Sequence, residues 1–97
     1  MAIYFIVTLD IHDPAVFGEY ALLAAATSTA ADGEILAVDD NPTTYEGKLP
    51  GSRVILLKFE DKASFLKWYE GEAYRRVKPM RINSATTHFG ITVHGMD

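Results

Sequence analysis

Hydrophobic and polar residues alternate along two stretches of the chain, and a third stretch is apolar almost without interruption. The alternating stretches are Ile3–Asp10 and Thr87–His94, and the apolar one is Arg53–Phe59. A shorter apolar segment, Glu34–Val38, follows Gly33. Period-two alternation and short runs rich in β-branched residues are typical of strands. The pattern therefore predicts four strands.

In chain order, the strand Glu34–Val38 follows Ile3–Asp10, and the residues between these two strands predict a helix. Asp13 is a good N-cap, and Pro14 suits the first helical position, where no backbone N–H is needed. From Pro14 to about Ala31 the chain is rich in alanine, and larger apolar side chains recur at helical spacing. Gly33 is a suitable stop.

The connection between the second and third strands contains turns and one further extended piece. Asp39–Pro42 bends the chain, Thr43–Glu46 is expected to be extended, and Leu49–Ser52 forms a turn built on proline and glycine.

A second helical region follows the third strand. Asp61 is its expected N-cap. Its aromatic residues recur at i, i+3 and i+4, namely Phe65, Trp68 and Tyr69. Gly71 interrupts it, and we expect a short helical piece over Glu72–Lys78. Pro79 should close that piece, because proline lacks the N–H that a helix interior uses.

The order β-α-β-β-α-β predicts an α+β, ferredoxin-like antiparallel sheet, with the first and third strands central and the helices on one face. Those two strands are apolar on both faces, which fits central positions. The uncovered face would then expose Ile6, Leu56 or their neighbours. Large apolar faces are rarely left in water, and a second copy with two-fold symmetry is the simplest cover. We therefore expect a homodimer. The alternative is a thick single core whose apolar surface associates only weakly with other molecules.

Composition narrows the class of protein. The 97 residues form one domain, 1–97, whose 48% hydrophobic content is ordinary for a globular chain. The net charge of −4 argues against a nucleic-acid partner, because phosphate contacts need a surplus of lysine and arginine. The apolar N-terminal run is too short to span a bilayer and lacks the features of an export signal. We therefore expect no membrane partner and a cytoplasmic location. Without cysteine there is no disulfide or thiolate chemistry.

The histidines do not suggest a metal site. His88 and His94 share a strand face, but their spacing along an extended chain puts them about 20 Å apart. His12 precedes the expected helix N-cap, where it should face solvent. We expect no metal and no cofactor. A role for His88 alone, acting on a substrate or as a haem ligand, stays open.

Four cations cluster near the end of the second helical region, namely Arg75, Arg76, Lys78 and Arg81. Cations near a helix C-terminus complement its dipole and stay hydrated, which is the simpler interpretation. The more specific interpretation is that the cluster is an anion gate, in which Arg81 pairs with a carboxylate through two parallel hydrogen bonds.

Glu46 and Arg53 flank the Leu49–Ser52 turn and could meet as a buried ion pair. Such residues at strand ends lie beside a cleft mouth. A buried pair is costly to desolvate, so a structural role and a catalytic role are both open.

A set of residues spread along the chain resembles the sequence pattern of a known family. The pattern includes Tyr4, Asp10, Pro14, Tyr20, Tyr45-Glu46-Gly47, Arg53, Phe59, Trp68-Tyr69, Glu72-Ala73-Tyr74, Pro79 and Arg81. Over nearly its whole length the chain resembles the domain-of-unknown-function 1330 family of the dimeric α/β-barrel superfamily. The resemblance implies a homodimer whose sheets face each other, a cleft between sheet and helices, and no established reaction. Superfamily relatives include cofactor-free monooxygenases, muconolactone-isomerase-like enzymes and haem-modifying proteins. The Asp39–Pro42 turn departs from the family pattern, where glycines are common.

Two hypotheses about function follow. The first is a small-molecule site for an organic acid or aromatic compound in the sheet–helix cleft, with cofactor-free oxygenation or isomerisation as its chemistry. Its catalytic candidates are Glu46 and Arg53, and its ligand-binding candidates are Tyr20, Trp68, Tyr74 and Arg81. The second is a non-catalytic dimeric ligand-binding or interaction module. A well-formed cleft lined by Glu46 and Arg53 would favour the first hypothesis, and a filled core would favour the second.

Overall fold

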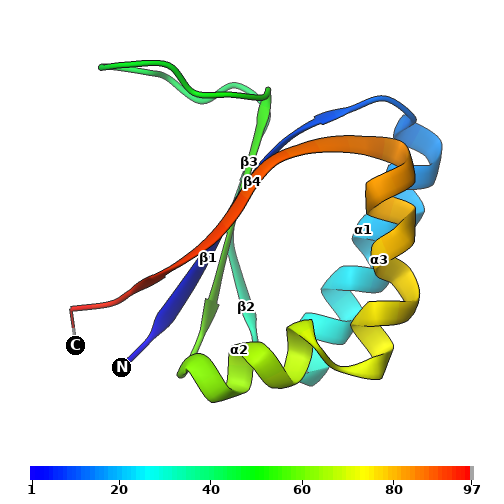
Figure 1. Ribbon diagram of the computed structural model, residues 1–97, viewed down its shortest axis with the longest axis vertical. Coiled ribbons are helices and arrows are strands. Elements are labelled where there is room, and N and C mark those ends of the chain that lie inside the picture. The colour runs from blue at the N-terminus through cyan, green and yellow to red at the C-terminus, as the bar shows by residue number, and fades with distance from the viewer. Residues whose placement is uncertain (97) are drawn as a thin grey trace.

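The computed structural model describes residues 1–96 as a four-stranded antiparallel sheet with three helices on one face (Figure 1). The strands are β1 (Ile3–Ile11), β2 (Glu34–Asp39), β3 (Arg53–Phe59) and β4 (Ala85–His94). The helices are α1 (Pro14–Ala30), α2 (Lys62–Tyr69) and α3 (Glu72–Ser84). The strand order β2-β3-β1-β4 places β1 and β3 in the centre, which confirms the ferredoxin-like prediction.

The register of β1 against β3 decides which side chains face the helices. Phe5 is opposite Leu57, and Leu9 is opposite Arg53. Phe5, Leu9 and Leu57 are buried in the core between sheet and helices. Because side chains alternate along a strand, Arg53 also points toward the helices.

Both predicted N-caps are present. The Asp13 carboxylate accepts a hydrogen bond from the Val16 backbone N–H at 3.2 Å, and the Asp61 carboxylate accepts one from Ser64 at 2.8 Å. Each bond satisfies a backbone donor that the first helical turn leaves free.

The prediction that Pro79 closes the last helix is wrong, because α3 continues to Ser84. Proline removes the hydrogen bond that the Arg75 carbonyl would accept in an α-helix. Arg75 and Pro79 are both exposed, so water can solvate that carbonyl. The extra turn matters for the site, because it carries Arg81 and Ser84 on the buried face of the helix.

The predicted extended piece Thr43–Glu46 is not a strand. Residues 40–52 form an irregular loop, the β2–β3 loop, which projects beyond the sheet (Figure 1). At its base Gly51 has φ 85°, and an added Cβ would lie 3.0 Å from the Leu9 backbone nitrogen. Ser52 then donates its backbone N–H to the Leu9 carbonyl at 3.2 Å. Tyr45, far out on the loop, is 90% exposed.

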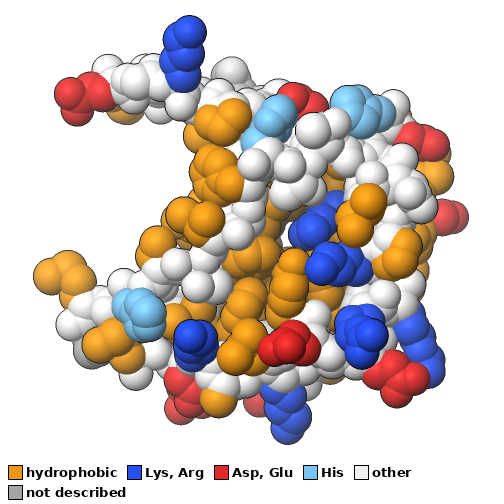
Figure 2. All heavy atoms as spheres, in the orientation of Figure 1, with side chains coloured by type: hydrophobic (Ala, Val, Ile, Leu, Met, Phe, Trp, Pro, Cys, Tyr) orange, Lys and Arg blue, Asp and Glu red, His pale blue; other side chains and the backbone are white. Residues whose placement is uncertain are grey.

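The sheet face opposite the helices is apolar and open. Ile6 is in register with Leu56 on β3 and with Ile91 on β4. Ile91 and Val93 remain 45% and 38% exposed. Figure 2 shows hydrophobic side chains gathered in the hollow on this side of the molecule. The two-sided apolarity of the central strands predicted such a face.

Within residues 1–96, no helix has the length and apolar character required to cross a membrane.

Candidate functional site

A cavity of about 100 Å³ lies between the sheet and the helices. Its floor is apolar and comes from the central strands, with Phe5, Val7 and Leu57. Ile35 and Val38 line it from β2 and are 44% and 54% exposed, so the open side lies along this edge strand. Figure 2 shows Lys and Arg side chains among hydrophobic ones in the gap between sheet and helices. The core is therefore not filled.

Small residues of α1 keep the cavity open. Ala21, Ala24 and Ala25 line it where larger side chains would occupy the space. The alanine-rich composition of this helix was visible in the sequence. Its effect on the site depends on which face of the helix meets the sheet, which the sequence pattern did not define.

One end of the cavity is polar and consists of Tyr20, Tyr74 and Arg81. The two tyrosine hydroxyls share a hydrogen bond of 2.7 Å, and Arg81 Nη1 donates to the Tyr74 hydroxyl at 3.2 Å. Arg81 is only 7% exposed, and its Nε is buried without a hydrogen-bond partner among residues 1–96. The Tyr74 oxygen accepts from Arg81, so its O–H can donate to Tyr20, which leaves the Tyr20 O–H free to donate to a ligand.

Burial fixes the protonation states at this end. It raises the pKa of Tyr20 and of Tyr74, so both stay neutral near pH 7. Burial lowers the pKa of Arg81, but the neighbouring Tyr74, Tyr20 and Tyr69 together raise it by more, and the net shift is upward. A buried cation therefore faces an apolar cavity beside neutral hydroxyl groups.

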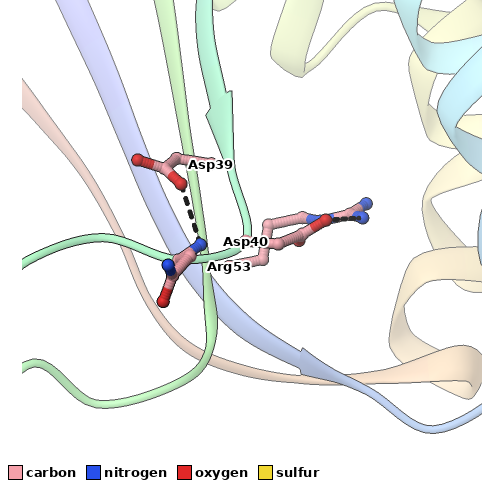
Figure 3. A network of polar contacts seen from close by, with 4 residues as sticks. Asp39, Asp40 and Arg53 are labelled. Carbon is pink, nitrogen blue, oxygen red and sulfur yellow. Dashed lines mark hydrogen bonds and ion pairs between the residues drawn. The ribbon is translucent and has the colours of Figure 1, made fainter.

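Arg53 is the second cation on the cavity wall. Its guanidinium lies over the Phe17 ring, 5.5 Å from the centroid. Its Nε and Nη2 both donate to the Asp40 carboxylate, the latter at 2.9 Å (Figure 3). This bond lowers the pKa of Asp40 and raises that of Arg53. The ion pair lies at the open side, because Asp40 directly follows β2.

The hypothesis that Arg53 pairs with Glu46 is wrong. Glu46 is exposed in the β2–β3 loop and does not line the cavity. Asp40 takes its place because β2 pairs with β3 such that Asp39 is opposite Val54, next to Arg53.

Trp68 forms part of the apolar wall. Its ring packs on Tyr74 with centroids 4.3 Å apart, and its Nε1 donates to the Thr27 hydroxyl at 3.0 Å. The indole N–H of Trp68 thus already has a hydrogen-bond partner, and this partner lies away from the cavity. Of the predicted site residues, the structure brings together Arg53, Tyr20, Trp68, Tyr74 and Arg81 around one cavity.

The basic cluster divides into two kinds of residue. Arg81 is buried in the cavity wall, whereas Arg76 makes an exposed ion pair with Glu72 at 2.7 Å. Lys78 Nζ lies 4.6 Å from the centroid of the Tyr69 ring. Partial burial raises the pKa of Tyr69, but Lys78 and Arg81 outweigh it and lower the pKa overall.

The histidines lie outside the cavity. His88 Nε2 is 2.7 Å from the Asp10 carboxylate, an interaction that lowers the pKa of Asp10, and His12 Nε2 contacts the Thr86 hydroxyl. Among the residues that the structure describes, no three His, Asp or Glu side chains gather where they could hold a metal ion.

Fold and cavity together define a ferredoxin-like domain with an apolar cleft that ends in a buried cation. The chain belongs to the family described as domain of unknown function (DUF1330), whose model matches residues 2–96. Comparison with curated proteins finds no match.

Several solved structures share the fold. RPA0582, a protein of unknown function from Rhodopseudomonas palustris, is 11% identical with a TM-score of 0.79 over 99% of this chain and 83% of that one. SnoaB, a cofactor-independent oxygenase from Streptomyces nogalater, is 14% identical with a TM-score of 0.72 over 99% and 94%. HapK from Hahella chejuensis is 14% identical with a TM-score of 0.64 over 97% and 92%. At these identities the similarity is one of fold alone.

Proposed function

We propose that this protein binds a small organic acid in the sheet–helix cavity, with Arg81 as the anchor for the carboxylate. The observation that carries the proposal is the buried Arg81 guanidinium, which has a phenol as hydrogen-bond partner. None of the described residues on the cavity wall carries a carboxylate.

A buried cation is stable only when its charge and its donors are satisfied. Arg81 uses Nη1 toward Tyr74, and the edge of the guanidinium that carries Nε is left without a partner. A carboxylate that reaches that edge, where Nε is buried, would form two parallel, charge-assisted hydrogen bonds. The free hydroxyl hydrogen of Tyr20 would supply a further donor.

The cavity limits the size of the ligand. Its volume of about 100 Å³ is below the roughly 150 Å³ of an engineered protein cavity that holds benzene. Its walls beyond the polar end are apolar. The ligand is therefore a short aliphatic acid or an acid with one small ring, whose apolar part lies against Phe5 and Leu57.

The test compares acids with uncharged amides of the same shape. Titration calorimetry and thermal shift with butyrate and butyramide should show binding of the acid only. Arg81→Met should abolish that binding and keep the fold, because an apolar side chain of similar volume is tolerated in place of a buried charge. Arg75→Met is the matched control, since Arg75 is exposed on the same helix. Equal binding of acid and amide, or unchanged binding by Arg81→Met, would refute the proposal.

Catalysis at this site is the second candidate, in the form of cofactor-free oxygenation or isomerisation. Arg81 and Tyr20 could stabilise an enolate oxygen in a water-poor cavity, and the fold shared with SnoaB motivates an oxygen-uptake assay. Among residues 1–96, no Asp, Glu or His lines the cavity to abstract a proton. The geometry therefore favours binding without catalysis.

The open sheet face supports a homodimer as the working state of the protein. Ile6, Leu56 and Ile91 form an apolar centre on this face, and a two-fold axis would bring the same surface of a second copy against it. Light scattering should then give twice the mass of the chain.

A further inference from the structure

We infer that Asp40 restricts the cavity to singly charged acids, so that monocarboxylates bind and dicarboxylates are rejected. The inference rests on the proposed function and adds the charge class of the ligand.

Two cations lie on the cavity wall. Within residues 1–96, Arg53 and Arg81 are the charged residues that line the cavity, and both face the same small space. Two guanidinium groups and no acid on the wall would suit a dicarboxylate, with one carboxylate at each cation. Without a further negative charge, the site would prefer such a ligand.

Asp40 supplies that negative charge. Its two carboxylate oxygens accept hydrogen bonds from Nε and Nη2 of Arg53. Because Arg53 lowers the pKa of Asp40, the carboxylate stays ionised at neutral pH. The edge of the Arg53 guanidinium that a ligand would need is thus occupied, and the net charge available to a ligand falls from two to one.

A dicarboxylate would have to displace Asp40 and then remain beside it. Like charges at short distance disfavour binding, and the lost pair must be replaced. A monocarboxylate binds Arg81 and leaves the Arg53–Asp40 pair intact. Its apolar part then lies against Phe5 and Leu57.

The chain supplies a matched control in the neighbouring residue. Figure 3 shows Arg53 and Asp40 extending toward the helices, whereas Asp39 points to the opposite side of the sheet. The Asp39 carboxylate accepts from the Asn41 backbone N–H at 2.8 Å. Asp39→Asn therefore removes the same formal charge one residue away without touching Arg53.

The experiment measures the affinity ratio of butyrate to succinate, which differ by one carboxylate, for the wild type, Asp40→Asn and Asp39→Asn. The wild type should prefer butyrate. Asp40→Asn should raise the relative affinity for succinate by about tenfold, and Asp39→Asn should leave the ratio nearly unchanged. Adding Arg53→Met to Asp40→Asn should cancel the gain, since Arg53 is the charge that was released.

The outcomes separate the two proposals. Equal effects of Asp39→Asn and Asp40→Asn, or no change with either, would overturn the role of Asp40 while leaving acid binding at Arg81 intact. A wild type that binds succinate more tightly than butyrate would likewise overturn the role of Asp40 and leave acid binding at Arg81 intact. Failure of the wild type to bind either acid, with the fold intact by circular dichroism, would overturn acid binding and this inference together.

Discussion

Arg81 and Tyr74 lie two turns apart on α3 and are joined by a hydrogen bond of 3.2 Å from Arg81 Nη1 to the Tyr74 hydroxyl. Tyr74 in turn bonds Tyr20 of α1 at 2.7 Å. A short polar chain thus links the two long helices at one end of an otherwise apolar cavity. It holds the guanidinium in place, which would lower the entropic cost of binding the proposed acid.

This polar chain predicts a loss of stability in alkaline solution. Burial raises the pKa of Tyr20 and Tyr74 above the ordinary value of 10. The unfolded chain releases these protons near pH 10 while the folded chain retains them, so the unfolded state binds fewer protons. Stability is therefore complete below pH 10 and falls above it, by up to about 1.4 kcal/mol per pH unit for each tyrosine.

Urea unfolding between about pH 9 and about pH 11 measures this slope. Tyr74→Phe should make it shallower than in the wild type. Tyr45→Phe is the control, because Tyr45 is 90% exposed, and it should leave the slope unchanged. A slope identical in all three proteins would show that the buried tyrosines do not carry the effect.

The cavity itself can be removed without removing its polar residues. Ala25 lines it from α1 and is half-buried, so Ala25→Leu should fill the space with apolar volume. We expect unfolding stability to stay within about 1 kcal/mol of the wild type, because the added methylenes enter an empty apolar space. Acid affinity should fall at least about tenfold.

The neighbouring Ala26→Leu makes the same change on the exposed side of the helix, outside the cavity. It should bind acids as the wild type does. If Ala25→Leu also binds normally, the ligand occupies some other part of the molecule.

The sequence predicted the fold correctly where a single local pattern determined the structure. Strand alternation and the caps Asp13 and Asp61 gave the element order and the central strands. The prediction that Pro79 closes the last helix was wrong because the helix-breaking rule considers only the local sequence. The cost of the missing hydrogen bond depends on whether the freed carbonyl reaches water. In α3 that carbonyl is on the exposed side, and the helix continues.

The site was only partly predictable for a similar reason. Tyr74 and Arg81 are seven residues apart and share one helix face, but only if the helix passes through Pro79. Proximity in sequence to the Pro50-Gly51 turn suggested Glu46 as the partner of Arg53. The register of β2 against β3 selects Asp40 instead, and a loop as long as residues 40–52 does not define that register. Which alanines of α1 face the sheet likewise depends on tertiary packing.

The open sheet face is expected to mediate the association of two copies. Ile91 lies on β4 opposite Ile6 and is 45% exposed in the single chain. If a second copy covers this face, Ile91→Lys would bury a charge without a partner at the centre of the interface, a cost of several kcal/mol. Light scattering at micromolar concentration should show twice the chain mass for the wild type and one chain mass for the variant.

Ile82→Lys separates this effect from a general change in surface charge. Ile82 is 59% exposed, but it lies on α3, on the helical side of the molecule. That variant should remain at twice the chain mass, because the sheet face is untouched. A wild type that scatters as a single chain, or an Ile91→Lys variant that stays paired, would mean that the apolar sheet face is not the surface through which two copies associate.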